Sequence, residues 1–237
     1  MINIEIINPK FFELNCRFII PSLKYEEYLI EVLNASTAYF SQKHPPYEKF
    51  ESPKSEDNGE CDANSSEYSI DFKLLIDESV MNAMAKNIPS VDYSTIQKGY
   101  IRVKKSTENC TVPNNNILFD LMDLQENDIQ FGNYSSTVKH LLKNLQKNKN
   151  LFLFYPYQIS TSKELDSQQY IKLLNSALAV IMEYRTKEQP NLETFVCIKV
   201  NRFFLIYEWT PKGFVFRDQV YEGLCSKYKE VKLYSLY

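Results

Sequence analysis

Three consecutive strand-like segments near the C-terminus constrain the fold more than any other feature of the sequence. They are rich in β-branched and aromatic residues and cover positions 193–200, 203–209 and 214–220. The links between them, Asn201-Arg202 and Thr210-Pro211-Lys212-Gly213, have the length and the residues of hairpin turns. The spacing predicts a three-stranded antiparallel meander, and a further strand is expected over 231–236.

Helical and strand-like patterns alternate along the rest of the chain. An apolar strand is expected over 151–157, followed by a helix over 166–187 that is apolar on most sides. The N-terminal part is expected to hold strands over 1–10, 67–76 and 99–104 and helices over 24–40, over 77–88 and from Ser135 onward. These patterns predict the α+β class, a mixed sheet with several helices and a C-terminal antiparallel β-meander. The expected lobes, 1–148 and 149–237, could also form one continuous domain.

Residues 52–66 form the segment least suited to folding. They are mostly serine, asparagine and acidic residues, with almost nothing apolar to bury. An exposed and mobile surface loop is therefore expected over 52–66.

Glycine is scarce, with only 5 residues among 237, or about 2% against a usual share of roughly 7%. Every glycine is isolated, so the glycine-rich loops that bring backbone amides close to phosphates are absent. The sequence also lacks a GxSxG nucleophile motif, and its only two histidines, His44 and His140, are too far apart for HExxH. These absences exclude the common nucleotide-binding, hydrolase and metalloprotease signatures.

Charge and cysteine content constrain the binding partner and the cellular compartment, but less strongly. The net charge of −3, with five arginines among 27 basic residues, argues against a surface built wholly for nucleic acid. The five cysteines form no CxxC pair, so a reducing compartment, the cytoplasm, is expected. No apolar run approaches the roughly 20 residues of a membrane-spanning helix, and no membrane association is expected.

The sharpest chemical pattern is Asp71 and Lys73, two residues apart, with Asp62 upstream. Many metal-dependent nucleases place an aspartate on one strand and a carboxylate-x-lysine triplet on the next. Because side chains alternate along a strand, Asp71 and Lys73 would share one face. The aspartates would hold Mg²⁺, and the lysine would orient or activate the attacking water. A glutamate of the preceding helix, Glu27 or Glu31, would complete such a site.

An acidic-x-lysine triplet also arises by chance in a chain with 30 acidic residues and 22 lysines. In that case Asp71 and Lys73 would form the solvated face of a half-buried strand, with Ile70, Phe72 and Leu74 toward the core. We favour this interpretation, under which the carboxylates do not converge.

A row of lysines, Lys139, Lys143 and Lys147, recurs every four residues opposite the leucines of the helix expected from Ser135. Such a row could hold a phosphate backbone. It is more often the solvent face of an amphipathic helix, and we favour that interpretation.

Aromatic residues make up 14% of the chain. They fill cores, and they are also enriched where proteins meet partners. Because enzyme signatures are missing and aromatics are abundant, the sequence favours a non-catalytic interaction subunit of an intracellular multi-protein complex, with a protein partner and no cofactor. The alternative is a Mg²⁺-dependent nuclease or nuclease-like domain that uses Asp62, Asp71 and Lys73 on nucleic acid.

Overall fold

The structure is a computed structural model and describes residues 16–21, 25–36, 39–40, 49–53, 60–66, 68–75, 100–103, 121–159, 167–225 and 230–235. The strand expected over 1–10 and the helix expected over 77–88 lie outside these ranges. Within them no helix combines the length and the apolar character needed to cross a membrane.

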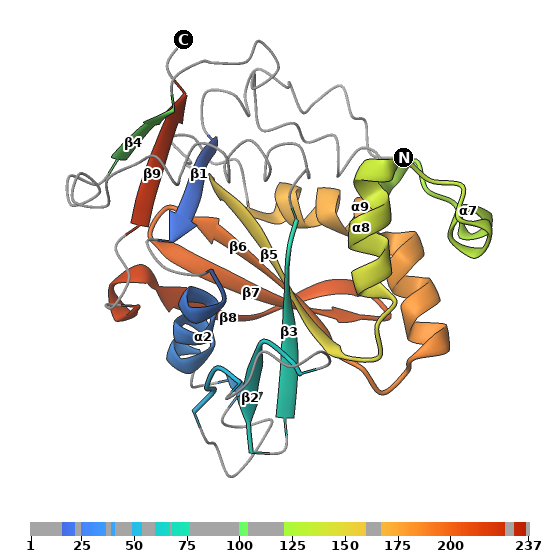
Figure 1. The fold of residues 1–237 in the computed structure, drawn as a ribbon, viewed down its shortest axis with the longest axis horizontal. Coiled ribbons are helices and arrows are strands. Elements are labelled where there is room, and N and C mark those ends of the chain that lie inside the picture. The colour runs from blue at the N-terminus through green and yellow to red at the C-terminus, as the bar shows by residue number, and fades with distance from the viewer. Residues whose placement is uncertain are drawn as a thin grey trace.

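The described strands form one nine-stranded mixed sheet (Figure 1). The strands are β1 (Cys16–Pro21), β2 (Ala63–Ser65), β3 (Tyr68–Leu74), β4 (Tyr100–Val103), β5 (Asn150–Ile159), β6 (Thr194–Val200), β7 (Phe203–Thr210), β8 (Gly213–Tyr221) and β9 (Glu230–Ser235). The main path runs β4-β9-β1-β5-β6-β7-β8, and β3 joins it by pairing with β5 on one side and with β2 on the other. Strands β3, β5 and β6 are parallel, whereas β6, β7 and β8 are antiparallel.

Helices cover both faces of this sheet. They are α2 (Tyr25–Ala35), α7 (Glu126–Phe131), α8 (Ser136–Leu145), α9 (Ser167–Glu188) and the short 3₁₀ helix η3 (Glu222–Leu224). One core lies on the face of α8 and α9, and a second lies on the face of α2. The α+β class and the C-terminal meander predicted from the sequence are therefore confirmed.

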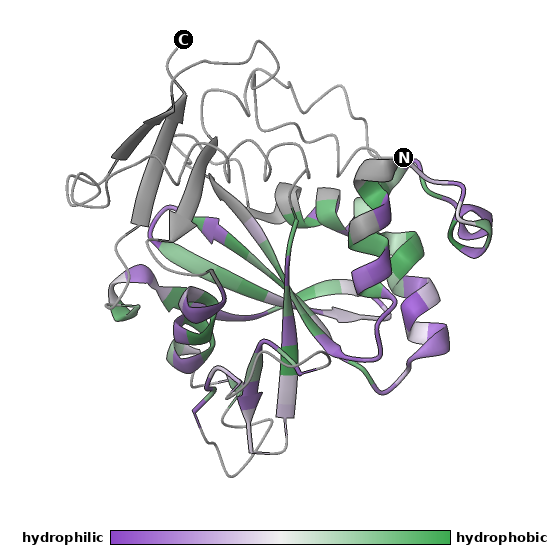
Figure 2. Ribbon diagram, in the orientation of Figure 1, coloured by the Kyte–Doolittle hydropathy of each residue, from purple (hydrophilic) through white to green (hydrophobic). Residues whose placement is uncertain are grey.

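Strand β5 contributes to both cores because its side chains alternate between the two faces. Leu151 and Leu153 belong to the α8/α9 core, and Phe152 and Phe154 to the α2 core. A strand covered on both faces is apolar throughout, and Figure 2 shows apolar residues concentrated in the central strands.

Helix α8 has the boundary and the buried stripe that its sequence predicts. The hydroxyl of Ser135 accepts a hydrogen bond from the backbone N–H of Val138 and so caps the helix. The apolar stripe is buried and consists of Val138, Leu141, Leu142 and Leu145. Because this stripe is fixed in the core, the opposite face of α8 must point to solvent.

Two parts of the described structure differ from the sequence-based expectations. The segment 52–66, expected as a surface loop, contains strand β2, in which Ala63 is fully buried. This expectation was wrong for residues 60–66 because pairing with β3 orders them without a large apolar content. Strand β1 and helix α7 were not predicted. The strands before and after residue 148 share one sheet, and the division into lobes 1–148 and 149–237 stays a prediction.

Candidate functional site

Two aspartates and two lysines meet beside the start of β5. The Nζ atom of Lys73 lies 2.9 Å from Oδ2 of Asp71 and 3.5 Å from Oδ2 of Asp62. The Nζ atom of Lys149 lies 3.6 Å from Oδ1 of Asp71. We call Asp62, Asp71, Lys73 and Lys149 the Asp–Lys cluster. Its first three members are the residues of the predicted nuclease pattern, and the structure brings them together.

The β2–β3 hairpin places Asp62 next to the Asp-x-Lys triplet. In this hairpin Ala63 pairs with Ile70, so Asp62, just before β2, comes alongside β3. Its Oδ2 atom accepts a hydrogen bond of 2.6 Å from the backbone N–H of Phe72, between the two charged residues of the triplet. The position of Asp62 is therefore fixed by the backbone of β3.

The parallel pairing of β3 with β5 brings in Lys149. Ile70 pairs with Asn150 and Asp71 with Leu151, so the residue before β5 lies beside Asp71. The side chain of Asn150 secures this point because it donates to the carbonyl of Ser69. Lys149 also donates to the carbonyl of Glu60 at 2.8 Å, which ties it to the segment that carries Asp62.

Arg185 of α9 holds the chain between α8 and β5. Its guanidinium donates to the carbonyls of Leu145 and Lys147 at 2.7 and 2.9 Å, and to that of Lys149. Burial lowers the pKa of Arg185 to about 10, so it stays charged at neutral pH. A buried cation thus satisfies the carbonyls after the end of α8 and fixes the backbone of Lys149.

Asp71 is only 2% exposed. The interpretation that it lies on a solvated strand face was therefore wrong, although Ile70 and Phe72 are buried as expected. Asp71 is buried because the second face of β3 is also covered. Its side chain lies on the same side as Leu151, toward the α8/α9 core and the segment that carries Lys149. Burial of a carboxylate is unfavourable unless charges or hydrogen bonds compensate it.

The two carboxyl groups of the cluster shift in opposite directions. Burial and the charge of Asp71 raise the pKa of Asp62 above its usual value, although Lys73 and the Phe72 N–H oppose this shift. Burial acts to raise the pKa of Asp71 as well, but its contacts with Lys73 and the charge of Lys149 outweigh burial and lower it. The carboxyl of Asp62, whose pKa is raised, therefore takes up a proton more readily than that of Asp71.

The donor set of the cluster suits one kind of metal. Among the described residues no group of three or more His, Cys, Asp and Glu side chains is placed to bind an ion. Zinc would need three or four such ligands. Mg²⁺ keeps several water ligands and is held in many enzymes by one or two carboxylates together with substrate phosphates. Asp62 and Asp71 supply that number of carboxylates.

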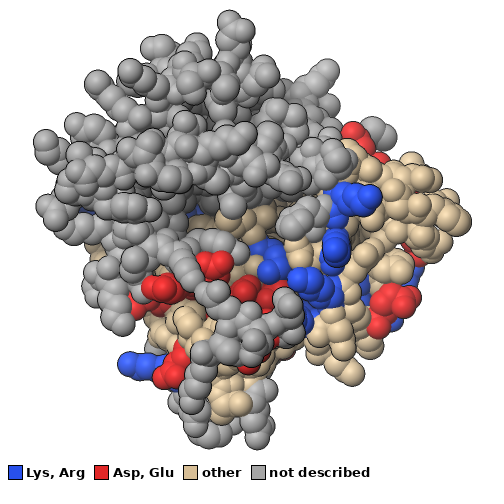
Figure 3. Space-filling view, in the orientation of Figure 1, with Lys and Arg blue, Asp and Glu red and all other residues tan. Residues whose placement is uncertain are grey.

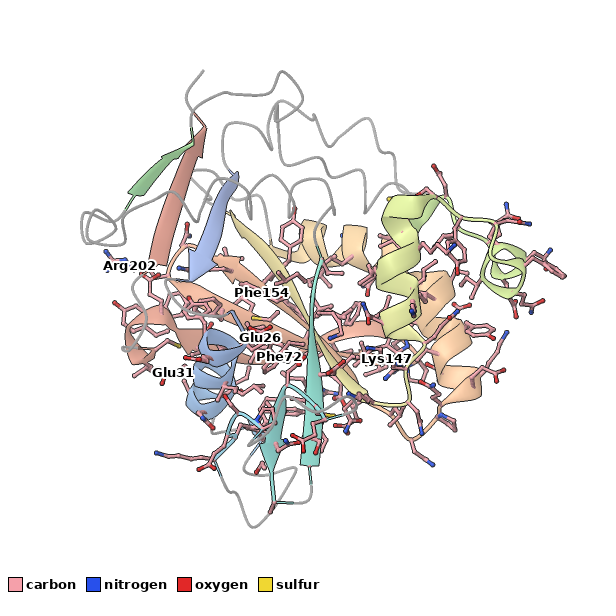
Figure 4. All side chains as sticks on the ribbon, in the orientation of Figure 1. Glu26, Glu31, Phe72, Lys147, Phe154 and Arg202 are labelled. Atoms are coloured by element: carbon pink, nitrogen blue, oxygen red, sulfur yellow. The ribbon has the colours of Figure 1, made fainter. Side chains whose placement is uncertain are left out.

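The helix glutamates do not complete the site. Glu31 lies near Cys225, which belongs to the α2 core. The pKa of Cys225 is raised mainly by burial and further by the charge of Glu31. In Figure 4, Glu31 on α2 and Lys147 next to α8 lie on opposite sides of Phe72. Neither Glu27 nor Glu31 forms a group of three metal-binding side chains with described residues. The expectation that one of them joins the two aspartates was wrong, because α2 packs on the other face of the sheet.

The predicted lysine row is exposed, as its helical spacing indicated. Lys139 and Lys143 lie on α8, and Lys147 follows shortly after the helix ends. Figure 3 shows basic atoms gathered over α8, with acidic atoms beside them toward β3. The row therefore ends close to the Asp–Lys cluster.

A second buried charge lies on the α2 face. Lys199 of β6 is fully buried, and its Nζ atom lies 2.7 Å from Oε2 of Glu222 in η3 and 5.2 Å from the ring centre of Phe204. Cys197, on the same strand, is buried in the α2 core. No pattern in the sequence indicates the Lys199–Glu222 pair.

Lys149 and Arg185 were also not predicted, because each acts through contacts with residues far away in the chain. The nearest signal is the position of Lys149 directly before an apolar strand.

The chain matches no protein-family model, no curated protein and no solved structure. The proposals that follow rest on the geometry of these residues.

Proposed function

We propose that the protein is a Mg²⁺-dependent nuclease or nuclease-like enzyme that hydrolyses phosphodiester bonds of nucleic acid. The observation that supports this most strongly is the convergence of Asp62, Asp71 and Lys73 from two adjacent segments of one sheet. The sequence alone favoured a non-catalytic subunit because enzyme signatures are missing and aromatics are abundant, and it favoured a solvated strand face for Asp71. The burial of Asp71 contradicts the second of these interpretations.

Each residue of the cluster has a chemical role in such a reaction. Asp62 and Asp71 would bind Mg²⁺, which lowers the pKa of a bound water and stabilises charge on the phosphate. Hydrolysis would form a bond between a water oxygen and phosphorus and break the bond to the leaving oxygen, and the proton lost by the water and the proton gained by the leaving oxygen would be exchanged with solvent. Lys73 would orient the water, and Lys149 would offset negative charge on the phosphate.

The pKa directions also favour a functional role over a purely structural one. In a purely structural ion pair, the lysine in contact lowers the pKa of the carboxylate. Here the pKa of Asp62 is raised mainly by burial, and Asp71 raises it further. Opposed shifts in a pair of adjacent carboxyls are typical of catalytic and metal-binding sites.

A cleavage screen tests this proposal. Purified protein is incubated with end-labelled single-stranded DNA, double-stranded DNA and RNA in Mg²⁺, in Mn²⁺ and in EDTA. The proposal expects cleavage of at least one substrate that requires the metal and disappears in EDTA. Equal cleavage in EDTA would point to a contaminating metal-independent nuclease and against this site.

The interaction subunit favoured by the sequence is retained as a second candidate function, because an exposed apolar patch supports it. Phe203, Tyr221 and Leu224 are 40%, 41% and 64% exposed, and the two rings lie 5.7 Å apart across β7 and β8. Large exposed aromatic residues are enriched at protein interfaces. A partner that co-purifies from the native host with the wild type, but not with Phe203→Ser plus Tyr221→Ser, would support this function. Retention of the partner by the double variant would exclude this patch.

A further inference from the structure

We propose that the lysine row, Lys139, Lys143 and Lys147, is the track along which the phosphate backbone of the substrate strand is bound on its way to the Asp–Lys cluster. This inference rests on the proposed function, since it assigns the substrate path of the same site. The sequence favoured a plain solvent face, and the position of the row beside the cluster is what changes that interpretation.

The first two lysines of the row have a fixed spacing and direction. Lys139 and Lys143 are four residues apart on α8, a rise of about 6 Å, and Lys147 follows just after the helix ends. The buried stripe opposite them prevents α8 from rotating. Three exposed lysines so close in the chain form a surface that attracts a polyanion.

The charges of the row are not matched by nearby acids in the described part of the chain. No described carboxylate lies within ion-pair distance of Lys139, Lys143 or Lys147. By contrast, Lys187 at the end of α9 pairs with Glu126 at 3.2 Å. Because no described carboxylate forms an ion pair with them, these three lysines keep their attraction for phosphate.

The row continues into the cluster through the segment that Arg185 holds. Lys147 and Lys149 are two residues apart, and Arg185 donates to the carbonyl of each. Lys149 in turn lies 3.6 Å from Asp71. The exposed row is therefore followed, two residues further on, by a lysine that contacts the cluster.

Arg185 also removes an electrostatic obstacle on this path. The C-terminal end of a helix carries partial negative charge on its free carbonyls, which repel phosphate. The guanidinium of Arg185 donates to the carbonyl of Leu145, the last residue of α8, and to two carbonyls beyond it. The end of α8 thus becomes compatible with an anionic ligand.

Binding measured by fluorescence anisotropy in EDTA tests the track without requiring cleavage. The variant Lys139→Glu plus Lys143→Glu is compared with the control Lys172→Glu plus Lys212→Glu, which changes the net charge equally at exposed lysines of α9 and of the β7–β8 turn. Labelled single-stranded DNA, double-stranded DNA and RNA are used, because all three carry the same phosphate chemistry. The tightest ligand then identifies the natural source.

We expect the track variant to bind at least about tenfold more weakly than the control, with the slope of log K against log salt reduced by about one per lysine. Equal affinities and slopes for the two double variants would overturn the track. Should the glutamate variant fail to fold, as judged by circular dichroism, Lys139→Gln plus Lys143→Gln carries the same comparison against Lys172→Gln plus Lys212→Gln.

The two proposals fail in different ways. A protein that cleaves nucleic acid with Mg²⁺, while both double variants bind and cleave alike, keeps the proposed function and loses the track. A protein that is inert with every metal, but whose track variant loses binding, keeps the track as a nucleic-acid surface and loses the proposed enzyme.

Discussion

The side-chain nitrogen of Lys149 lies 3.6 Å from Oδ1 of Asp71, although α7 and α8 separate the two residues in the chain. Lys73 lies 2.9 Å from the other oxygen of the same carboxylate. Asp71 is therefore held ionised between two lysines, whereas the pKa of Asp62 beside it is raised. As the pH falls, Asp62 therefore takes up a proton before Asp71 does.

Asp62→Asn is expected to raise the melting temperature at pH 7. Because folding raises the pKa of Asp62, the folded state favours its protonated form. The resulting stabilisation is fully present below the usual pKa of 3.8 and is lost as the pH rises through the pKa of Asp62 in the folded protein. Asparagine imitates the neutral acid and can still accept from the Phe72 N–H. Thermal melts from pH 3 to pH 8 check this, and a lower melting temperature of the variant at pH 7 would show that ionised Asp62 stabilises the fold.

Asp71→Asn is expected to show the opposite dependence in the same melts. Its pKa is lowered, so its contribution is present above the usual value of 3.8 and is lost as the pH falls through the folded value. The variant should melt below the wild type at pH 7, and the difference should shrink in acid. A constant difference at all pH values would mean that packing, and not charge, is responsible.

Arg185→Gln should lower the free energy of unfolding by at least about 2 kcal/mol, because it leaves buried carbonyls after α8 without a donor. Urea unfolding measures this change. The matched control is Arg202→Gln, whose side chain is 73% exposed, and it should change stability by no more than about 0.5 kcal/mol. Equal effects of the two substitutions would contradict the anchoring role of Arg185.

The Lys199–Glu222 pair predicts an asymmetry between two substitutions. Glu222→Gln removes the charge that lies 2.7 Å from a fully buried ammonium, and should destabilise the protein by about 2 kcal/mol or more. Lys199→Met replaces the buried charge by an apolar chain of similar length and should be close to neutral. Calorimetric melts measure the stability of both variants. A larger loss of stability for Lys199→Met than for Glu222→Gln would mean that Lys199 stabilises the fold through contacts other than its pair with Glu222.

The sequence predicts elements whose signal is local. The leucine stripe of α8, the buried face of α9 with Leu174, Leu178 and Ile181, and the meander β6–β8 all appear as expected, because periodicity and turn residues within one segment determine them. The strand with Asp71 and Lys73 was also expected, whereas Asp62 was expected in the surface loop 52–66.

The features that were not predicted from the sequence depend on contacts between residues far apart in the chain. The burial of Asp71 requires β5 and the segment with Lys149 to cover the second face of β3. Nothing near Asp71 in the sequence indicates that covering. Strand β2 has little apolar content, and its pairing with β3 and the bridge between Asn64 and Glu51 make it a strand. The anchoring contacts of Arg185 likewise join α9 to the end of α8.

The most direct test of the nuclease proposal is the metal-dependent cleavage rate of the wild type against Asp71→Asn and Lys73→Met, measured well below their melting temperatures. Asp123→Asn, at an exposed aspartate outside the cluster, serves as the control. The proposal predicts Mg²⁺-dependent cleavage by the wild type and the control, reduced roughly 100-fold or more in both cluster variants. A wild type that is inert with Mg²⁺ and Mn²⁺ on DNA and RNA, or cluster variants as active as the control, would contradict it.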